Sequence, residues 1–275
     1  MAITAQDVKR LREATGVGMM DCKKALVETD GDFDAAIELL RKKGQKVAAK
    51  RADRDATEGV VATAQTEDGT AAAMVEVNCE TDFVARNEDF TAFAQSIADL
   101  ALAERPADRD ALLALSLNGQ TVAEAITEKT GQIGEKIDVR RVSVLSAENG
   151  QIVDYIHPGA KLGVLVEMAG EGELSEAGRD VAMQAAAMNP VAATRDDVPQ
   201  DVQDKEREIG REQARAEGKP EQILDKIAEG KLNRYFKDNV LVEQPFVKDS
   251  SMTVQKMLES KGAELKQFVR FALGG

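Results

Sequence analysis

The chain is organised around residues 74–87, which read Met74-Val75-Glu76-Val77-Asn78-Cys79-Glu80-Thr81-Asp82-Phe83-Val84-Ala85-Arg86-Asn87. The apolar residues Met74, Val75 and Val77 predict a β-strand. Thr81 or Asp82 can cap a following helix, because a short side-chain oxygen accepts a hydrogen bond from a first-turn N–H that has no partner within the helix. The stretch therefore predicts a strand that runs through a turn directly into a helix.

Phe83 falls in the first turn of that helix, and two interpretations of its ring stay open. The ring packs into the core with Phe90, or it stands out at the helix tip beside a carboxylate. Buried phenylalanine is the commoner case in proteins. Residue type alone therefore favours the core interpretation.

Composition excludes several classes of protein. The 275 residues are 43% hydrophobic, which is enough for more than one core. No stretch approaches about 20 apolar residues and the N-terminus has no secretory core, so we expect no membrane segment. A net charge of −13 and the absence of tryptophan make the chain a poor binder of free nucleic acid. Cys22 and Cys79 have neither disulfide nor metal-knuckle spacing, which suits a reducing cytoplasm.

The sequence also lacks the residues of common active sites. His157 is the one histidine, so a histidine triad or a multi-histidine metal site is not expected. Neither a Gly-x-x-x-x-Gly-Lys-Ser/Thr loop nor a Gly-x-Gly-x-x-Gly after a strand occurs. The sequence therefore predicts a binding protein that performs no covalent chemistry and uses no cofactor or metal.

The first 54 residues differ in charge from the rest. They carry a net +3, whereas the remainder carries −16, which marks a boundary near Arg54-Asp55. Three short helices are expected here: the first after Thr4, the second over Asp21 to Glu28, the third from Asp32 to Gly44. Their inward residues are expected to be Val8, Leu11, Ala14, Cys22, Ala25, Leu26, Phe33, Ala36, Ile37 and Leu40.

Two features of this module could contact a partner. Met19 and Met20 cannot easily both point inward, so we expect one in the core and one as an adaptable contact surface. The segment Arg41 to Arg54 is basic. It is either a solvated linker helix or a contact to an acidic partner helix.

The middle of the chain repeats one order of elements. A β-hairpin over 60–77 turns at Asp68-Gly69 and precedes a long helix. A second hairpin over 152–168 precedes a second helix, so we expect two related α+β subdomains side by side. The first long helix has an apolar stripe of Phe83, Phe90, Phe93, Ile97 and Leu100, and the further expected elements are helices over 108–117, 121–130 and 175–188 and a strand over 137–145.

Residues 199–217 are almost entirely polar, with Val202, Ile209 and Ala216 seven residues apart. After a turn at Gly218-Lys219-Pro220, the apolar residues of a second helix face back along the first. A narrow seam with charged flanks predicts an antiparallel coiled-coil hairpin that protrudes from the body. The segments 244–247 and 268–273 are expected to close the second sheet.

The predicted fold class is therefore α+β. We expect a three-helix module with a basic linker over 1–54, a core subdomain over 55–140 and a second over 141–275. The coiled-coil hairpin is inserted in the second at about 190–235.

Several separate segments resemble bacterial elongation factor Ts. Asn78 to Arg86 is closely similar to the signature of that family, and Thr15 to Leu26 resembles its ubiquitin-associated-like N-terminal module. The other similar segments are Lys129 to Ile137, Tyr155 to Val166, Gln244 to Val247 and Val269 to Phe271. Two positions depart from the pattern: Lys248 stands where an apolar contact residue often follows Val247, and the chain ends soon after Phe271.

The resemblance implies a guanine nucleotide exchange factor for elongation factor Tu in the cytoplasm. In this family an Asp-Phe pair, here Asp82 and Phe83, is a wedge that enters elongation factor Tu near its Mg²⁺ and phosphate site. The wedge segment also includes Thr81 and Val84. The other partner contacts implied are Met19, Met20, Lys23, Ile133, His157 and Val247. A homodimer, or a complex with two copies of each protein joined through the coiled-coil hairpin, is a further alternative.

Two rival functions remain at this stage. The chain could be an adaptor, with a ubiquitin-associated-like module joined to an acidic coiled-coil scaffold and no exchange activity. It could also be an enzyme that uses paired carboxylates, although 31% charged residues make such pairs expected by chance.

Overall fold

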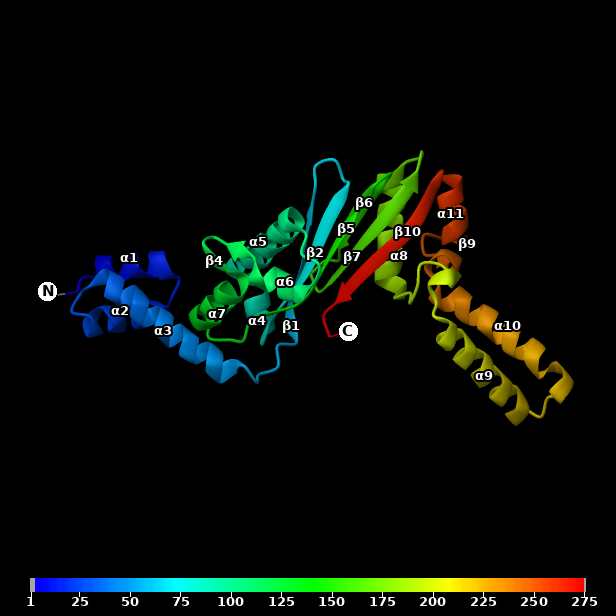
Figure 1. The fold of residues 1–275 in the computed structure, drawn as a ribbon, viewed down its shortest axis with the longest axis horizontal. Coiled ribbons are helices and arrows are strands. Elements are labelled where there is room, and N and C mark those ends of the chain that lie inside the picture. Colours follow the sequence, from blue (N-terminus) through cyan, green and yellow to red (C-terminus); the bar gives the residue numbers. More distant parts are fainter. Residues whose placement is uncertain (1–2, 275) are drawn as a thin grey trace.

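The computed structural model describes residues 3–274, so residues 1, 2 and 275 of the two terminal domains predicted above lie outside the described residues. Three helices come first: α1 (Ala5–Thr15), α2 (Met19–Glu28) and α3 (Phe33–Arg51). Thr4 caps α1 in a reciprocal capping box with Asp7, and Gly16 ends it with φ +66°. These helices lie at one end of an elongated molecule (Figure 1). Their shared core consists of Val8, Leu11, Cys22, Ala25, Leu26, Ala36 and Leu40.

Three sequence expectations for this module are wrong. α3 does not end at Gly44 but continues to Arg51, because Gly44 lies against Gly131 of another helix and gains packing there. Ala14 is exposed. Met19 and Met20 are both exposed, at 51% and 64%, because α2 fills the small core with Cys22, Ala25 and Leu26 instead.

The first sheet has the strand order β1-β2-β5, with all pairs antiparallel. Its strands are β1 (Glu58–Gln65), β2 (Ala71–Cys79) and β5 (Asp138–Ser146). The predicted hairpin turn is confirmed, with Gly69 at φ +72°. Every residue of the central strand β2 is buried. A domain boundary at 140/141 is therefore wrong, because it would cut β5, which pairs with β2 along its length.

Helices cover the outer face of this sheet. They are the single-turn α4 (Asp82–Ala85), α5 (Glu88–Glu104), α6 (Arg109–Ala114) and α7 (Val122–Ile133), with a small hairpin of β3 (Ser116–Leu117) and β4 (Gln120–Thr121) before α7. The expected long helix with Phe83 in its apolar stripe is wrong. α4 ends at Ala85 and Asn87 caps α5, so the stripe starts at Phe90.

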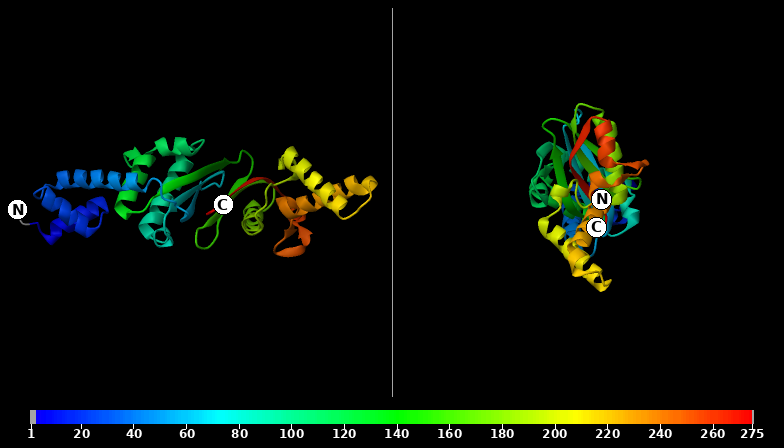
Figure 2. Two further views of the ribbon diagram at one scale, coloured as in Figure 1. Left: turned by 90° about the horizontal axis from the view of Figure 1, so that it is seen from below. Right: turned by 90° about the vertical axis from the view of Figure 1, so that its right-hand side faces the viewer.

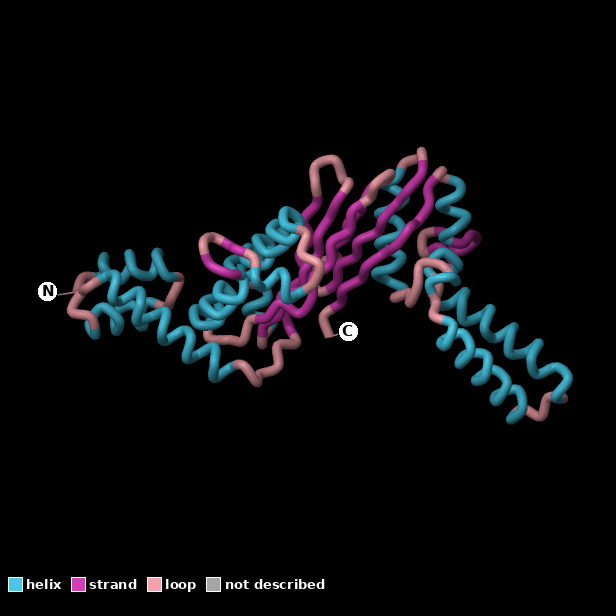
Figure 3. The backbone as a smooth tube through the Cα atoms, in the orientation of Figure 1, coloured by secondary structure: helices cyan, strands magenta, loops and turns pink. Residues whose placement is uncertain are grey.

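The second sheet repeats this plan with the order β10-β7-β6. Its strands are β6 (Gln151–Ile156), β7 (Leu162–Gly170) and β10 (Ala263–Ala272), covered by α8 (Leu174–Met188) and α11 (Val254–Ser260). The two sheets face each other, with helices on both outer sides (Figure 3). A Cβ on Gly163 of β7 would lie 2.7 Å from Val61 and 2.9 Å from Met74, so this glycine lets the sheets approach. The layer between them consists of Val61, Ala72, Met74, Leu145, Ile152, Leu165 and Phe271.

The segment expected to join the second sheet at 244–247 does not do so. It forms β8 (Pro245–Phe246), which pairs with β9 (Asp249–Thr253) as a separate two-stranded unit. Among residues 3–274, β10 is the one strand of the C-terminal region that joins the second sheet, where it pairs with β7.

The helices α9 (Gln200–Ala216) and α10 (Glu221–Asn239) project from the body as an antiparallel pair (Figure 2). Ion pairs Arg207–Glu229, Arg211–Asp225 and Arg215–Glu221 flank the pair. The buried seam of α9 contains Gly210 and Ala214, not Ala216, which is exposed. A Cβ on Gly210 would lie 2.9 Å from the Cα of Ala228, so small residues bring the two backbones together. The pair also extends beyond the expected end at 235, because Leu232 and Phe236 pack with Ala192, Val198 and Val240 at its base.

Candidate functional site

Phe83 stands out from α4 and lies outside the core. Its side chain is 82% exposed, whereas Phe90 is completely buried. The helix α4 has a single turn with Thr81 as its N-cap, and Asp82 forms an ion pair with Arg86 at 2.9 Å. In Figure 1 α4 lies at the lower end of β1 and β2. The structure therefore decides between the two interpretations of Phe83 in favour of the exposed tip.

Thr81 joins α4 to the segment after α7. Its backbone N–H donates to one carboxylate oxygen of Glu135 at 3.0 Å, and its hydroxyl donates to the other at 2.7 Å. Because Glu135 receives two hydrogen bonds from one residue, it fixes both the backbone and the side chain of the cap.

Glu80 makes a second set of contacts one residue earlier. Its carboxylate accepts bonds of 2.7 and 2.8 Å from the Arg51 guanidinium, and 2.7 Å from the backbone N–H of Lys136. The Lys136 N–H, followed by the Arg51 side chain, holds the pKa of Glu80 below its ordinary value. The Lys136 ammonium donates to the carbonyls of Ala52 and Arg54 at 2.8 and 2.9 Å. The end of α3 is thereby tied to the start of α4.

Cys79 closes the core beneath this region. Its thiol is buried and donates to the Thr81 carbonyl at 3.2 Å. Burial raises the pKa of Cys79 to about 12. The side chain therefore stays an uncharged thiol at neutral pH and acts as a packing group.

Two other predicted contact residues lie around the same end of the first sheet. Ile133 is half-buried and ends α7 two residues before Glu135. His157 is exposed in the β6–β7 turn, where the Tyr155 hydroxyl and its Nδ1 are 3.0 Å apart. That turn is tied to β1 by an ion pair of 2.6 Å between Lys161 and Glu58, and Glu58 lies opposite Cys79.

The remaining predicted contacts lie elsewhere. Met19, Met20 and Lys23 lie on the exposed surface of α2. Val247 follows β8 and is 49% exposed. All of them are accessible, and they lie on elements near opposite ends of the molecule (Figure 1).

Lys248 has a structural role that the sequence did not predict. Its ammonium contacts the carboxylate of Asp180 on α8 at 2.6 Å, and Asp180 also pairs with Lys261 at 3.3 Å. Its neighbour Val247 donates its N–H to the buried side chain of Gln184 at 2.8 Å. The residue that departs from the family pattern thus fixes the turn that exposes Val247.

Sequence reasoning also missed the residues that hold the base of α4. Glu135 and Lys136 lie within Lys129 to Ile137, but nothing in spacing alone connects them to Glu80 and Thr81, which lie more than 50 residues away. Arg51 lies in the basic stretch Arg41 to Arg54, and the charge of that stretch does not indicate its contact with Glu80.

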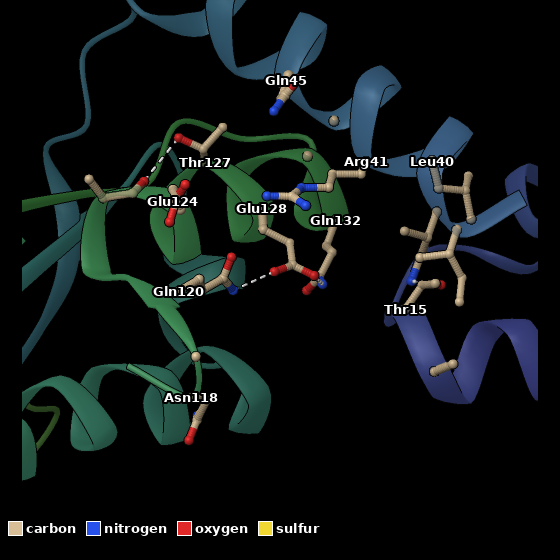
Figure 4. A pocket seen from close by; sticks show the side chains of 17 residues that line it. Thr15, Leu40, Arg41, Gln45, Asn118, Gln120, Glu124, Thr127, Glu128 and Gln132 are labelled. Atoms are coloured by element: carbon tan, nitrogen blue, oxygen red, sulfur yellow. Dashed lines mark hydrogen bonds between the residues drawn. The ribbon is translucent and has the colours of Figure 1, made fainter. Parts of the chain in front are cut away.

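A cavity of about 560 Å³ lies between α3 and α7 (Figure 4). Some polar side chains that line the cavity bond to one another: Gln120 and Gln132 donate hydrogen bonds to the Glu128 carboxylate at 2.7 and 3.2 Å. Phe83 does not line it. Within residues 3–274 no group of three or more His, Cys, Asp or Glu side chains is placed to hold a metal ion, and no helix is long and apolar enough to cross a membrane.

Comparisons with known proteins find similar proteins along almost the whole chain. A family model described as "Elongation factor TS" matches residues 80–275. The chain is 50% identical over 284 residues to elongation factor Ts of Chloroherpeton thalassium, covering 99% of this chain and 98% of that protein. It is 51% identical over 278 residues to elongation factor Ts of Amoebophilus asiaticus, with full coverage of both. The protein of the same name from Alkalilimnicola ehrlichii is 49% identical over 274 residues, covering 100% of this chain and 93% of that protein.

Proposed function

The chain belongs to the elongation factor Ts family of translation elongation factors, and on that premise we propose that it is a guanine nucleotide exchange factor that binds elongation factor Tu·GDP and promotes GDP release. The observation that carries this proposal is the position of Phe83. A large apolar side chain that is 82% exposed on a single helical turn gains packing only from a partner. Asp82 stands beside it.

The mechanism follows from how GTPases hold GDP. They use a phosphate-binding loop and a Mg²⁺ ion whose ligands include phosphate oxygens, protein oxygens and water. Phe83 separates packed elements of the partner, while the Asp82 carboxylate disturbs the water shell of that ion. If this chain weakens GDP binding, GDP weakens binding of this chain by the same factor. That reciprocity allows GTP to displace the exchange factor.

The proposed complex is extended. Ile133 and His157 contact a helix of the nucleotide-binding domain beside the wedge of Thr81, Asp82, Phe83 and Val84. Met19, Met20 and Lys23 form a second contact, and Val247 faces another domain of elongation factor Tu. All these residues lie at accessible or half-buried positions.

Finer features of the fold belong to the same proposal. We assign α1–α3 as a ubiquitin-associated-like module and α9–α10 as an antiparallel coiled coil. A homodimer or a complex with two copies of each protein would form through that coiled coil in the cytoplasm.

The test is release of labelled GDP from elongation factor Tu. Catalytic amounts of the chain should accelerate release, and excess unlabelled GDP should weaken the complex. A capture experiment from bacterial extract should retain elongation factor Tu as the main protein. Capture of other proteins without accelerated GDP release would favour the adaptor function instead.

A further inference from the structure

The base of α4 is held by two consecutive residues of a distant segment. Thr81 donates twice to Glu135, at 2.7 and 3.0 Å, and Glu80 accepts from the backbone of Lys136 at 2.7 Å. Arg51 adds two bonds to Glu80 from the end of α3. We refer to Arg51, Glu80, Thr81, Glu135 and Lys136 together as the clamp.

We propose that Glu135 and Arg51 are positioning residues for nucleotide exchange, which hold α4 so that Phe83 meets the partner in one fixed orientation. This inference rests on the proposed exchange function. Neither residue has to touch elongation factor Tu to act in this way.

Within α4 itself, Val84 and Ala85 pack on the first core, and its other side chains add little to its orientation. A helix of four residues has almost no stability of its own, because helix nucleation is unfavourable. The ring of Phe83 is 82% exposed and has little packing with residues 3–274. The Asp82–Arg86 ion pair is also exposed, and such pairs contribute little. Ala85 is buried and Val84 is half-buried against the first core, so these two side chains and the residues that precede α4 together set its orientation.

The clamp has the geometry that orientation requires. Its bonds join a charged group to a donor, which makes them shorter and stronger than neutral ones. Two different elements supply these bonds, because Arg51 is the last residue of α3 and Glu135 follows the end of α7. Removal of Glu135 leaves both the N–H and the hydroxyl of Thr81 without their acceptor. A displacement of about 1 Å in a reacting group can slow a reaction about 100-fold.

The test compares full-length variants in GDP release from elongation factor Tu, measured over a range of exchange-factor concentrations. Glu135→Ala and Arg51→Gln should lower the saturating rate about 10-fold, while the half-saturating concentration changes less than about 2-fold. Both bonds to Glu80 come from the Nη1 of Arg51. Arg51→Lys keeps the positive charge on a shorter side chain, so its rate should fall between those of Arg51→Gln and the unchanged protein.

Two controls lose similar contacts away from α4. Glu128→Ala removes a carboxylate of α7 that accepts from Gln120 and Gln132, and Arg109→Gln removes an ion pair of 2.8 Å with Asp138. Both should exchange GDP at the unchanged rate. The melting temperature of every variant is measured on the same preparation, and rates are expressed per folded molecule. Glu135→Gln, which keeps the side-chain volume and one acceptor oxygen, replaces Glu135→Ala if the latter unfolds.

A double variant separates positioning from general stability. If Glu135 acts through Phe83, then Glu135→Ala should slow exchange no further once Phe83→Ala is present. Additive losses would overturn the inference, as would a lower melting temperature with an unchanged rate per folded molecule. If Phe83→Ala slows release while Glu135→Ala and Arg51→Gln do not, the positioning role fails and the exchange function stands. If Phe83→Ala has no effect either, the wedge itself is wrong.

Discussion

At the scale of single residues, two phenylalanines seven positions apart have opposite environments. Phe90 starts the apolar stripe of α5 and is completely buried, whereas Phe83 is 82% exposed on α4. The break at Asn87 produces this difference, because it caps a new helix and changes the direction of the chain.

We expect Phe83→Ala to leave the melting temperature nearly unchanged and to slow GDP release from elongation factor Tu by about 10- to 100-fold, a loss of roughly 1.4–2.8 kcal/mol in the transition state. The ring has little packing to lose in the free protein, because it is 82% exposed. Phe90→Ala is the matched control and should cost about 3–5 kcal/mol of unfolding free energy. A Phe83→Ala protein that melts many degrees lower, yet exchanges GDP normally at low temperature, would place the ring in the core.

The contacts of Glu80 predict how the stability of the protein depends on pH. Its pKa in the folded protein lies below the ordinary value, through the Lys136 N–H first and Arg51 second. Such a carboxylate stabilises the fold above its unfolded pKa, and this contribution is lost as the pH falls through the folded pKa. Glu80→Gln should therefore cost about 1–2 kcal/mol at pH 7. That difference should shrink as the pH falls below about 4.3.

Chemical denaturation between pH 3 and pH 7 measures this difference. Glu67→Gln serves as the control, because Glu67 is exposed and has no hydrogen bond or ion pair with the described residues. If Glu80→Gln lowers the free energy of unfolding equally at pH 3 and pH 7, the pKa of Glu80 is not lowered in the folded protein.

At the scale of elements, the contact between α3 and α7 depends on two glycines that face each other. A Cβ on Gly131 would lie 2.4 Å from the Cα of Gly44, whereas a Cβ on Gly44 would lie 3.4 Å from the Cα of Gly131. The two positions are neighbours but differ in the space available.

Gly131→Ala should therefore destabilise the protein by about 1–3 kcal/mol, because backbone atoms have to move apart. Gly44→Ala meets ordinary contact and gains up to about 1 kcal/mol of helix propensity, so its effect should be neutral or stabilising. Urea denaturation of the two variants checks the prediction. Equal effects at the two positions would show that the helices are less closely packed than described.

Patterns of single elements were predicted well, whereas contacts between elements were not. The Asp68-Gly69 hairpin and α8 follow from local residues and were predicted. The helix end at Gly44 was wrong, because Gly131 lies 87 residues away and local sequence cannot show it. The contact between Thr81 and Glu135 could not be predicted for the same reason, because the two residues lie far apart in the sequence. The sequence alone does not decide the exposure of Phe83, because a capped helix with an apolar first turn fits either orientation.

At the scale of the whole molecule, two sheets back to back carry modules at both ends. The α9–α10 pair has its own cluster at its base, where Val198 and Leu232 pack with Phe236. The outer part of the pair is held by the close contact of Gly210 with Ala228, by the buried Leu224 and by ion pairs. Only the base is therefore part of the body.

We expect replacement of residues 208–228 by a short Gly-Ser link to leave cooperative unfolding intact, with a melting temperature within a few degrees of the unchanged protein. The link would join Arg207 and Glu229, whose side chains pair at 3.2 Å. Replacement of 196–235 removes Val198 and Leu232 and should lower the melting temperature clearly. Calorimetry of both variants tests this, and loss of cooperativity in the shorter replacement would mean that the outer pair is integral to the body.

Because α3 is one uninterrupted helix, it affects how strongly the protein can bind a partner that contacts both of its ends. Its 19 residues span roughly 28 Å as one helix, which Gly131 and Glu80 hold against the core. The exposed methionines of α2 and the ring of Phe83 therefore stay at a set spacing, with no flexible tether between them. Once one site engages a partner of matching shape, the other is already within reach, at a high effective concentration. Two weak contacts can then give strong binding, and a partner with a different spacing can use only one of them.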